Sequence, residues 1–132
     1  MISILDQEFS ALNQYIAEQN PSQIFILVDE NTHENCLPTL LANLETEIPF
    51  EIIEIEAGED AKTIATATQL WEILAEFKAD RKSLLLNLGG GVITDMGGFV
   101  ASTYKRGIKF INIPTTLLAM CDASIGGKTG ID

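Results

Sequence analysis

The sequence alternates between short apolar runs and segments with helical periodicity, and this alternation restricts the chain to few folds. The apolar runs are "QIFILVD" (23–29), "FEIIEIE" (50–56), "SLLLNL" (83–88) and "KFINIP" (109–114). The first and third are continuously apolar, which is typical of strands buried on both faces of a parallel sheet. The second alternates apolar and acidic residues, so it predicts a strand nearer the edge of the sheet.

Helical segments separate these predicted strands. The clearest is 61–79, in which apolar residues recur on one face, expected to be buried: Ile64, Ala67, Leu70, Trp71, Leu74 and Phe77. Helices are also predicted over 34–44, with Pro38 near the first turn, over about 92–104, over 115–125 and within 1–22. Strand–helix–strand repetition predicts an α/β fold, a Rossmann-like, doubly wound, mainly parallel sheet with helices on both faces.

Doubly wound sheets bind ligands beyond the carboxyl ends of their strands. Each predicted strand is followed there by small or polar residues, which we expect to line one edge of the sheet. These residues are Asp29, the pair Gly58 and Glu59, the triplet Gly89 to Gly91, and the pair Thr115 and Thr116.

Composition excludes several classes of protein. A length of 132 residues suits one domain, and the net charge of −11 argues against nucleic-acid binding. No apolar run approaches the roughly 20 residues that span a bilayer, and the N-terminus has no basic segment of a signal peptide. These features predict a soluble cytoplasmic protein. Cys36, Cys121 and His33 lack metal-ligand spacing, so no metal site is predicted within the chain.

The charge is unevenly distributed along the chain. Residues 1–80 hold two Lys/Arg and 16 Asp/Glu, whereas residues 81–132 hold six Lys/Arg and three Asp/Glu. Because the glycine clusters also lie in the second part, we expect anionic small molecules to be attracted there.

The stretch "NLGGGVITDMGG" (87–98) carries the strongest indication of a ligand. A glycine-rich turn between a strand and a helix offers free backbone N–H groups to an anion, and the helix dipole adds to the attraction. The stretch matches neither the dinucleotide fingerprint GxGxxG nor GxxxxGK[ST]. A tight turn followed by a close helix crossing would also explain the glycines.

Two basic stretches follow it. Lys128 lies between glycines in "SIGGKTGID" (124–132) and suits an anion, although an ordinary surface loop has the same composition. In "YKRG" (104–107), Lys105 and Arg106 could serve a ligand or simply a helix end before Gly107.

With these pieces assembled, "GGGVITDMGGFVASTYKRGIKFINIPTTLLAMCDASIGGKTG" resembles the signature region of the 3-dehydroquinate synthase family. The upstream "GEDAK" (58–62) is similar as well. The resemblance implies that residues 1–132 are the N-terminal NAD-binding domain of a longer enzyme. Its helical C-terminal domain, with the ligands of a zinc or cobalt ion, would lie outside this sequence, so the fragment alone should be inactive. The full-length enzyme would be a homodimer.

The resemblance also assigns residues. Asp122, Lys128 and Arg106 would contact the substrate, Arg106 either within its own subunit or in the neighbouring one. The residues implied to contact NAD are Asp29, Asn31, Gly58, Glu59, Lys62, Gly90, Gly91, Val92, Ile93, Thr94, Asp95, Thr115, Thr116 and Lys128. Thr94, Cys121 and Ala123 depart from the residues common in the family.

The activity implied is that of a phosphate-eliminating lyase. It converts 3-deoxy-D-arabino-heptulosonate 7-phosphate to 3-dehydroquinate, a step of the shikimate pathway, with NAD taking and returning a hydride. Three alternatives remain at this stage. The chain could come from another sugar phosphate cyclase, of the valiolone or scyllo-inosose type, from a polyol dehydrogenase of the same fold, or from a non-catalytic nucleotide-binding module.

Overall fold

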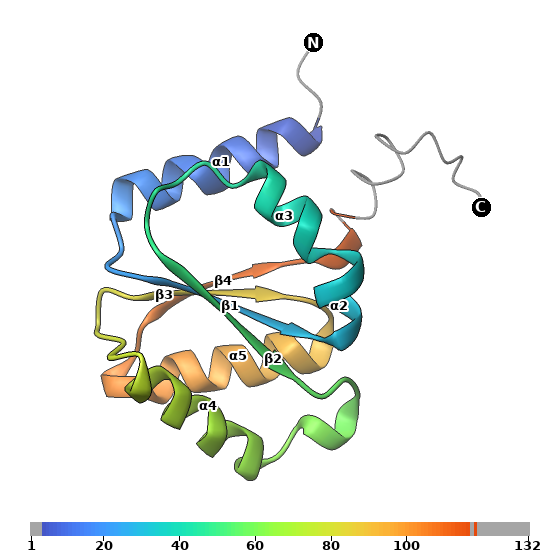
Figure 1. Ribbon diagram of the computed structural model, residues 1–132, viewed down its shortest axis with the longest axis vertical. Helices are drawn as coiled ribbons and strands as arrows, with labels where there is room; N and C mark the ends of the chain where they lie inside the picture. Colours follow the sequence, from blue (N-terminus) through green and yellow to red (C-terminus); the bar gives the residue numbers. More distant parts are fainter. Residues whose placement is uncertain (1–3, 117, 119–132) are drawn as a thin grey trace, which may run out of the picture.

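Four parallel strands form the centre of the molecule, as the sequence predicts (Figure 1). The computed structural model describes residues 4–116 and 118. Strands β1 (Ile24–Asp29), β2 (Phe50–Ile55), β3 (Leu84–Leu88) and β4 (Lys109–Ile113) lie in the order β2-β1-β3-β4. All neighbouring pairs are parallel, so the carboxyl ends of the strands meet at one edge, called here the site edge.

Helices cover both faces of the sheet (Figure 1). Helices α1 (Ile4–Gln19) and α3 (Leu37–Asn43) lie on one face, and α4 (Ile64–Glu76) and α5 (Gly91–Thr103) lie on the other. Helix α2 (Glu30–Asn35) follows β1 at the site edge. Two short 3₁₀ segments complete the described part, η1 (Glu59–Ala61) before α4 and η2 (Tyr104–Arg106) after α5.

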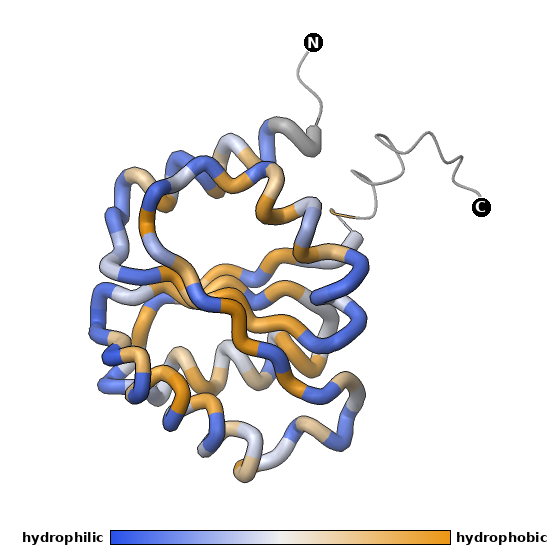
Figure 2. The backbone as a smooth tube through the Cα atoms, in the orientation of Figure 1, coloured by the Kyte–Doolittle hydropathy of each residue, from blue (hydrophilic) through white to orange (hydrophobic). Residues whose placement is uncertain are grey.

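The core has two halves, one on each face of the sheet. On β1, Phe25 and Leu27 pack toward α4 and α5, whereas Ile24, Ile26 and Val28 pack toward α1 and α3. Because β1 and β3 are buried on both faces, they are mostly apolar, and the hydropathy colouring shows the centre of the molecule as mostly hydrophobic (Figure 2). The alternating strand β2 is an outermost strand of the sheet, with a neighbouring strand on one side only, as predicted.

The structure differs from the sequence expectations at two helices. The segment 34–44 is divided between α2 and α3 at Cys36, because Pro38 in the first turn of α3 cannot donate the backbone hydrogen bond of a continuous helix. Helix α4 begins at Ile64, and this side chain, expected on the buried face, is 68% exposed. Most of the predicted helix 115–125 lies outside the described residues. Within the described part, no helix is long and apolar enough to cross a membrane.

Candidate functional site

The glycine triplet Gly89–Gly91, called here the glycine loop, lies where the sheet topology favours a ligand site. The chain passes from β1 outward to β2 and returns to β3 on the other side of β1, which makes the crevice between β1 and β3 the topological switch point. Leu27 is paired with Asn87, so Asp29 and Gly89 each follow two residues later at the same edge. The glycine loop and Asp29 therefore flank this crevice.

The three glycines of the loop serve different purposes. A Cβ on Gly89 would lie 3.0 to 3.2 Å from side-chain atoms of Ile93, so Gly89 is explained by internal packing. A Cβ on Gly90 or Gly91 would meet no atom of the described residues within 4 Å, and neither glycine has a positive φ. Nothing inside the described fold requires glycine at these two positions. Their backbone is open to a group that approaches from outside.

The N-terminus of α5 is suited to receive an anion at this opening. The N-cap residue is Gly90, which makes no side-chain capping bond, whereas Asp29 caps α2 and Thr63 caps α4. The N–H groups of residues 91–93 have no partner within the helix and stand at the positive end of its dipole. Thr94 already donates its N–H to the Gly90 carbonyl at 3.0 Å. The Ile93 side chain is buried, so only its backbone can reach a ligand.

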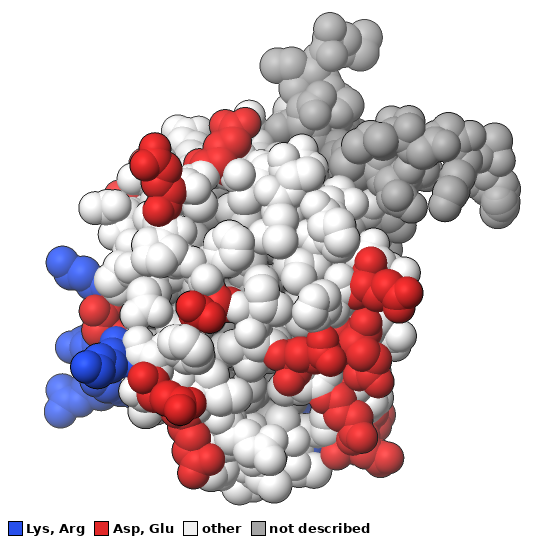
Figure 3. Space-filling view, viewed as in Figure 1, with Lys and Arg blue, Asp and Glu red and all other residues white. Residues whose placement is uncertain are grey.

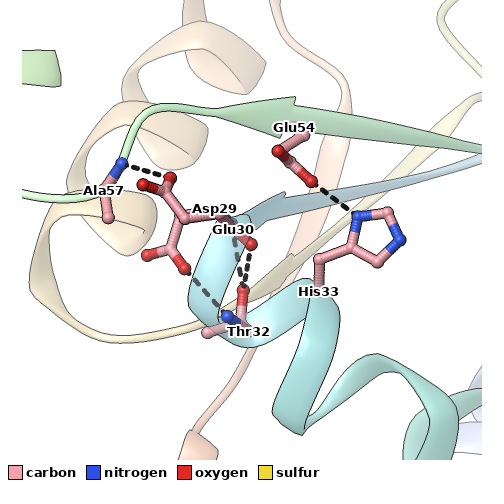
Figure 4. A network of polar contacts seen from close by, with 6 residues as sticks. All are labelled: Asp29, Glu30, Thr32, His33, Glu54 and Ala57. Carbon is pink, nitrogen blue, oxygen red and sulfur yellow. Dashed lines mark hydrogen bonds and ion pairs between the residues drawn. The ribbon is translucent and has the colours of Figure 1, made fainter.

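The Asp29 side chain, at the other side of the crevice, caps the start of α2 (Figure 4). Its Oδ1 accepts a hydrogen bond from the Thr32 N–H at 2.8 Å, and its own N–H donates to Thr32 Oγ1 at 3.0 Å. This capping box fixes the start of α2 and, among the described residues, leaves Oδ2 without a partner. Glu30 accepts the Ala57 N–H at 2.8 Å, which ties the loop after β2 to α2. Asn31 is exposed beside this network.

Lys62 and Asp95, two of the residues implied to contact the cofactor, form an ion pair with each other. Lys62 Nζ lies 2.8 Å from Asp95 Oδ2, and both side chains are about half exposed. The hydrogen bond to Asp95 raises the pKa of Lys62, and the charges of Asp95 and Glu59 add to this effect. The pair joins the loop after β2 to α5. In that loop, Gly58 has φ of 99°, a conformation that favours glycine.

The segment after β4 reaches the same edge. Ile113 pairs with Leu88, and its carbonyl accepts the Gly89 N–H at 3.3 Å. Thr115 and Thr116 follow after Pro114, beyond the carboxyl end of β4, which is the strand next to β3. Asp122 and Lys128, expected to contact the substrate, lie outside the described residues.

Arg106 lies at the end of a helix, as the sequence indicates, and this helix end is at the opposite edge of the sheet from the glycine loop. Helix α5 runs for 13 residues, about 20 Å, from the glycine loop to η2, which carries Arg106. Six of the seven described Lys/Arg gather there, in a group called here the basic edge (Figure 3). Its members are Lys78, Arg81, Lys82, Lys105, Arg106 and Lys109. The described cations that follow residue 80 share the second part of the sequence with the glycine loop, but they lie at the other end of the strands.

The described part of the chain offers no metal centre. In residues 4–116 and 118 no three His, Cys, Asp or Glu side chains are grouped to hold an ion. His33 is an exposed helix residue, as the sequence suggests, and its Nδ1 lies 2.6 Å from Glu54 Oε1 on β2 (Figure 4).

Asn87 is the residue at this edge that our sequence reasoning missed. Its side chain is fully buried, and its Nδ2 donates to Asn112 Oδ1 on β4 at 3.0 Å. An amide inside the apolar run "SLLLNL" is the signal that could have drawn attention to it.

Fold and site together define an α/β domain in which a glycine-rich loop opens a helix at the switch point of a parallel sheet. A family model described as 3-dehydroquinate synthase N-terminal matches residues 52–132, and the chain belongs to this family.

Named relatives agree with that assignment. The chain is similar to the 3-dehydroquinate synthase of Parabacteroides distasonis, with 47% identity over 123 residues, which are 93% of this chain and 35% of that protein. It is 46% identical to the 3-dehydroquinate synthase of Pyrococcus abyssi over 132 residues, which are 100% of this chain and 39% of that protein. The chain thus spans little more than a third of these relatives.

Solved structures share the fold. A 2-deoxy-scyllo-inosose synthase superposes with a TM-score of 0.73 at 25% identity, over 82% of this chain and 31% of that one. A 2-epi-5-epi-valiolone synthase from Streptomyces hygroscopicus, solved with NAD⁺ and Zn²⁺ bound, gives 0.67 at 32% identity, over 100% of this chain and 36% of that one.

Proposed function

We propose that residues 1–132 form the NAD-binding N-terminal domain of a 3-dehydroquinate synthase. The observation that carries this proposal is the open backbone at Gly90 and Gly91, because internal packing does not account for these glycines. It occurs at the uncapped start of α5 and at the topological switch point. A 2-deoxy-scyllo-inosose synthase and the 2-epi-5-epi-valiolone synthase, both of this fold, were solved with NAD⁺ bound, which supports the dinucleotide as the ligand.

The residues present fit such a cofactor. The N–H groups of Gly91, Val92 and Ile93 would receive the pyrophosphate, whose negative charge the helix dipole favours. Across the crevice, Asp29 Oδ2 would accept hydrogen bonds from ribose hydroxyl groups, with Asn31 beside it. Further polar contacts would come from Gly58, Glu59, Lys62, Thr94, Asp95, Thr115 and Thr116, and from Lys128.

The proposed reaction is the phosphate-eliminating cyclisation of 3-deoxy-D-arabino-heptulosonate 7-phosphate to 3-dehydroquinate. NAD, when bound, supplies a reversible hydride acceptor, and the protein holds and orients the reactants. Asp122 and Lys128 would contact this substrate, whose carboxylate and phosphate need cationic and N–H partners. Arg106 lies at the basic edge, so within this chain it is remote from the glycine loop. The proposal therefore assigns it to the site of a neighbouring subunit in a homodimer.

A divalent metal, zinc or cobalt, belongs to the proposal for the whole protein. The same two cyclases were solved with Co²⁺ and with Zn²⁺, respectively. The described residues do not supply its ligands. We therefore propose that the metal ligands come from a helical C-terminal domain outside this sequence and that the fragment alone is inactive. Separately, we propose that the protein is cytoplasmic.

The alternative candidate function is that of another sugar phosphate cyclase, and structural similarity supports it. The inosose and valiolone synthases superpose well on this chain, at TM-scores of 0.73 and 0.67. The alternative is tested by offering the protein at its natural length several sugar phosphates and measuring phosphate release. Release from the heptulosonate phosphate with formation of 3-dehydroquinate supports the first proposal. Release from another sugar phosphate alone refutes it.

The cofactor site is tested by calorimetric titration with NAD. We compare the parent protein with Gly91→Glu, which places a carboxylate in the opening at the start of α5. The matched control is Ser102→Glu, which adds the same charge at an exposed position near the other end of the same helix. Loss of binding in the first variant alone supports the pyrophosphate position. Equal binding by all three proteins contradicts it.

A further inference from the structure

The buried amide of Asn87 and the absent side chain of Gly97 fit one another. Asn87 lies on β3 two residues before the glycine loop, and Gly97 lies on α5 six residues after it. A Cβ built on Gly97 would lie 1.9 Å from Asn87 Oδ1 and 2.3 Å from its Cγ. The Asn87 side chain therefore occupies the space that any side chain at position 97 would need. Together the two residues close the strand–loop–helix unit from inside.

The Asn87 side chain cannot move aside to make space for a side chain at position 97. Its side chain is 0% exposed, and its Nδ2 is held by Asn112 Oδ1, the residue paired with it in register on β4. Its Oδ1 has no hydrogen-bond partner among the described residues and lies against the backbone of Gly97. A methyl group there would have to move by roughly 1.5 Å to reach an ordinary contact distance. Such a shift would displace α5 from the sheet or break the link to Asn112.

We propose that Asn87 is a positioning residue for the cofactor site. Through Gly97 it sets how closely α5 approaches β3, and with that the position of the N–H groups at the start of α5. Through Asn112, which precedes Thr115 by three residues, it ties the segment after β4 to the same unit. Because Asn87 is fully buried beneath the site edge, it would act through its neighbours and not through direct contact with the cofactor. The inference rests on the proposed function, because it assumes that a dinucleotide binds at the glycine loop.

A double-mutant cycle in the protein at its natural length tests the fit between the Asn87 side chain and Gly97. The variants are Asn87→Ala, Gly97→Ala and the double variant. We expect each single variant to raise the Kd for NAD roughly tenfold, as a small misplacement of binding groups does. The double variant should recover much of this loss, because the methyl group of residue 97 then fills space that the amide has vacated. The kcat at saturating NAD and the KM for the sugar phosphate should change little.

The control separates positioning from stability. Leu40→Ala removes a fully buried side chain from α3, on the opposite face of the sheet. It should lower the melting temperature at least as much as Asn87→Ala and leave the Kd for NAD unchanged. If the Kd instead rises in proportion to lost stability in every variant, including Leu40→Ala, Asn87 has no positioning role.

Backbone amide chemical shifts of Gly90, Gly91 and Val92 give a readout that needs no cofactor. We expect both single variants to displace these shifts, the double variant to restore them, and Leu40→Ala to leave them in place. Unchanged loop shifts, or effects that simply add in the double variant, overturn the inference. A parent protein that fails to bind NAD overturns the proposed function instead, because the shift comparison still decides the positioning role.

Discussion

A methyl group on Gly91 should separate folding from cofactor binding. In Gly91→Ala the new Cβ meets no atom within 4 Å in the described part of the chain, and the residue does not have a positive φ. The free energy of unfolding should therefore rise by about 0.4–1 kcal/mol, because alanine restricts the unfolded chain more than glycine does. The same methyl group projects into the opening that a pyrophosphate would need, so it should displace the anion from the N–H groups of α5.

The expected loss of affinity follows from those hydrogen bonds. A hydrogen bond to a charged group contributes about 1.5–3 kcal/mol, so losing one raises the Kd for NAD roughly 10- to 100-fold. Urea unfolding gives the stability, and calorimetric titration gives the affinity. Gly97→Ala is the contrasting variant, because its Cβ overlaps Asn87 and overpacking costs about 1–3 kcal/mol.

Two results would refute this reasoning. A marked loss of stability in Gly91→Ala would show that the fold itself needs glycine at this position. An unchanged Kd for NAD in a stable Gly91→Ala protein would show that the opening at the start of α5 is not where the anion lies.

Three further predictions concern titrating groups. Asp95→Asn should lower the pKa of Lys62, which an NMR titration measures; an unchanged pKa would contradict the ion pair. The hydrogen bond from Ser22 lowers the pKa of Asp80, so the ionised Asp80 carboxylate stabilises the fold. This stabilisation is present above the usual carboxyl pKa and is lost as the pH falls through the pKa of Asp80 in the folded protein. Ser22→Ala should therefore move acid unfolding to higher pH, and an unmoved midpoint would refute this. Burial raises the pKa of Tyr104, which stabilises the fold below about pH 10 and less above it. Tyr104→Phe should cost about 1–3 kcal/mol at neutral pH, because a buried carbonyl loses its donor, and this difference should shrink in alkaline urea titrations; a constant difference would contradict the assignment.

The strands could be located from the sequence almost to the residue. Continuous apolar runs identify strands covered on both faces, and the alternating run "FEIIEIE" correctly indicated the edge strand β2. The order β2-β1-β3-β4 was not predicted, because periodicity shows which face of a strand is buried but not which strand lies next to it. The switch point, and with it the place of the glycine loop, therefore needed the structure.

The candidate site was predicted only in part. The glycine loop and Asp29 were recognised because both directly follow strands, and parallel strands bring such residues to one edge. The contact between Asn87 and Gly97 was missed because it depends on the distance between a helix and a strand. Arg106 was correctly placed at a helix end, but the sequence did not show how far the 13-residue helix α5 separates it from the glycines.

The gathering of cations at the basic edge makes the molecule an electric dipole. At the site edge the described charges are mostly negative. The acidic residues there are Asp29, Glu30, Glu59 and Asp95, and the described cation is Lys62, which pairs with Asp95. An anionic dinucleotide approaching this side would move against the long-range field of a chain with net charge −11, so its capture would depend on short-range contacts such as the N–H groups at the start of α5. Added salt shortens the reach of the repulsion. The association rate of such a ligand with this domain should therefore rise with ionic strength, opposite to the behaviour of electrostatically steered binding.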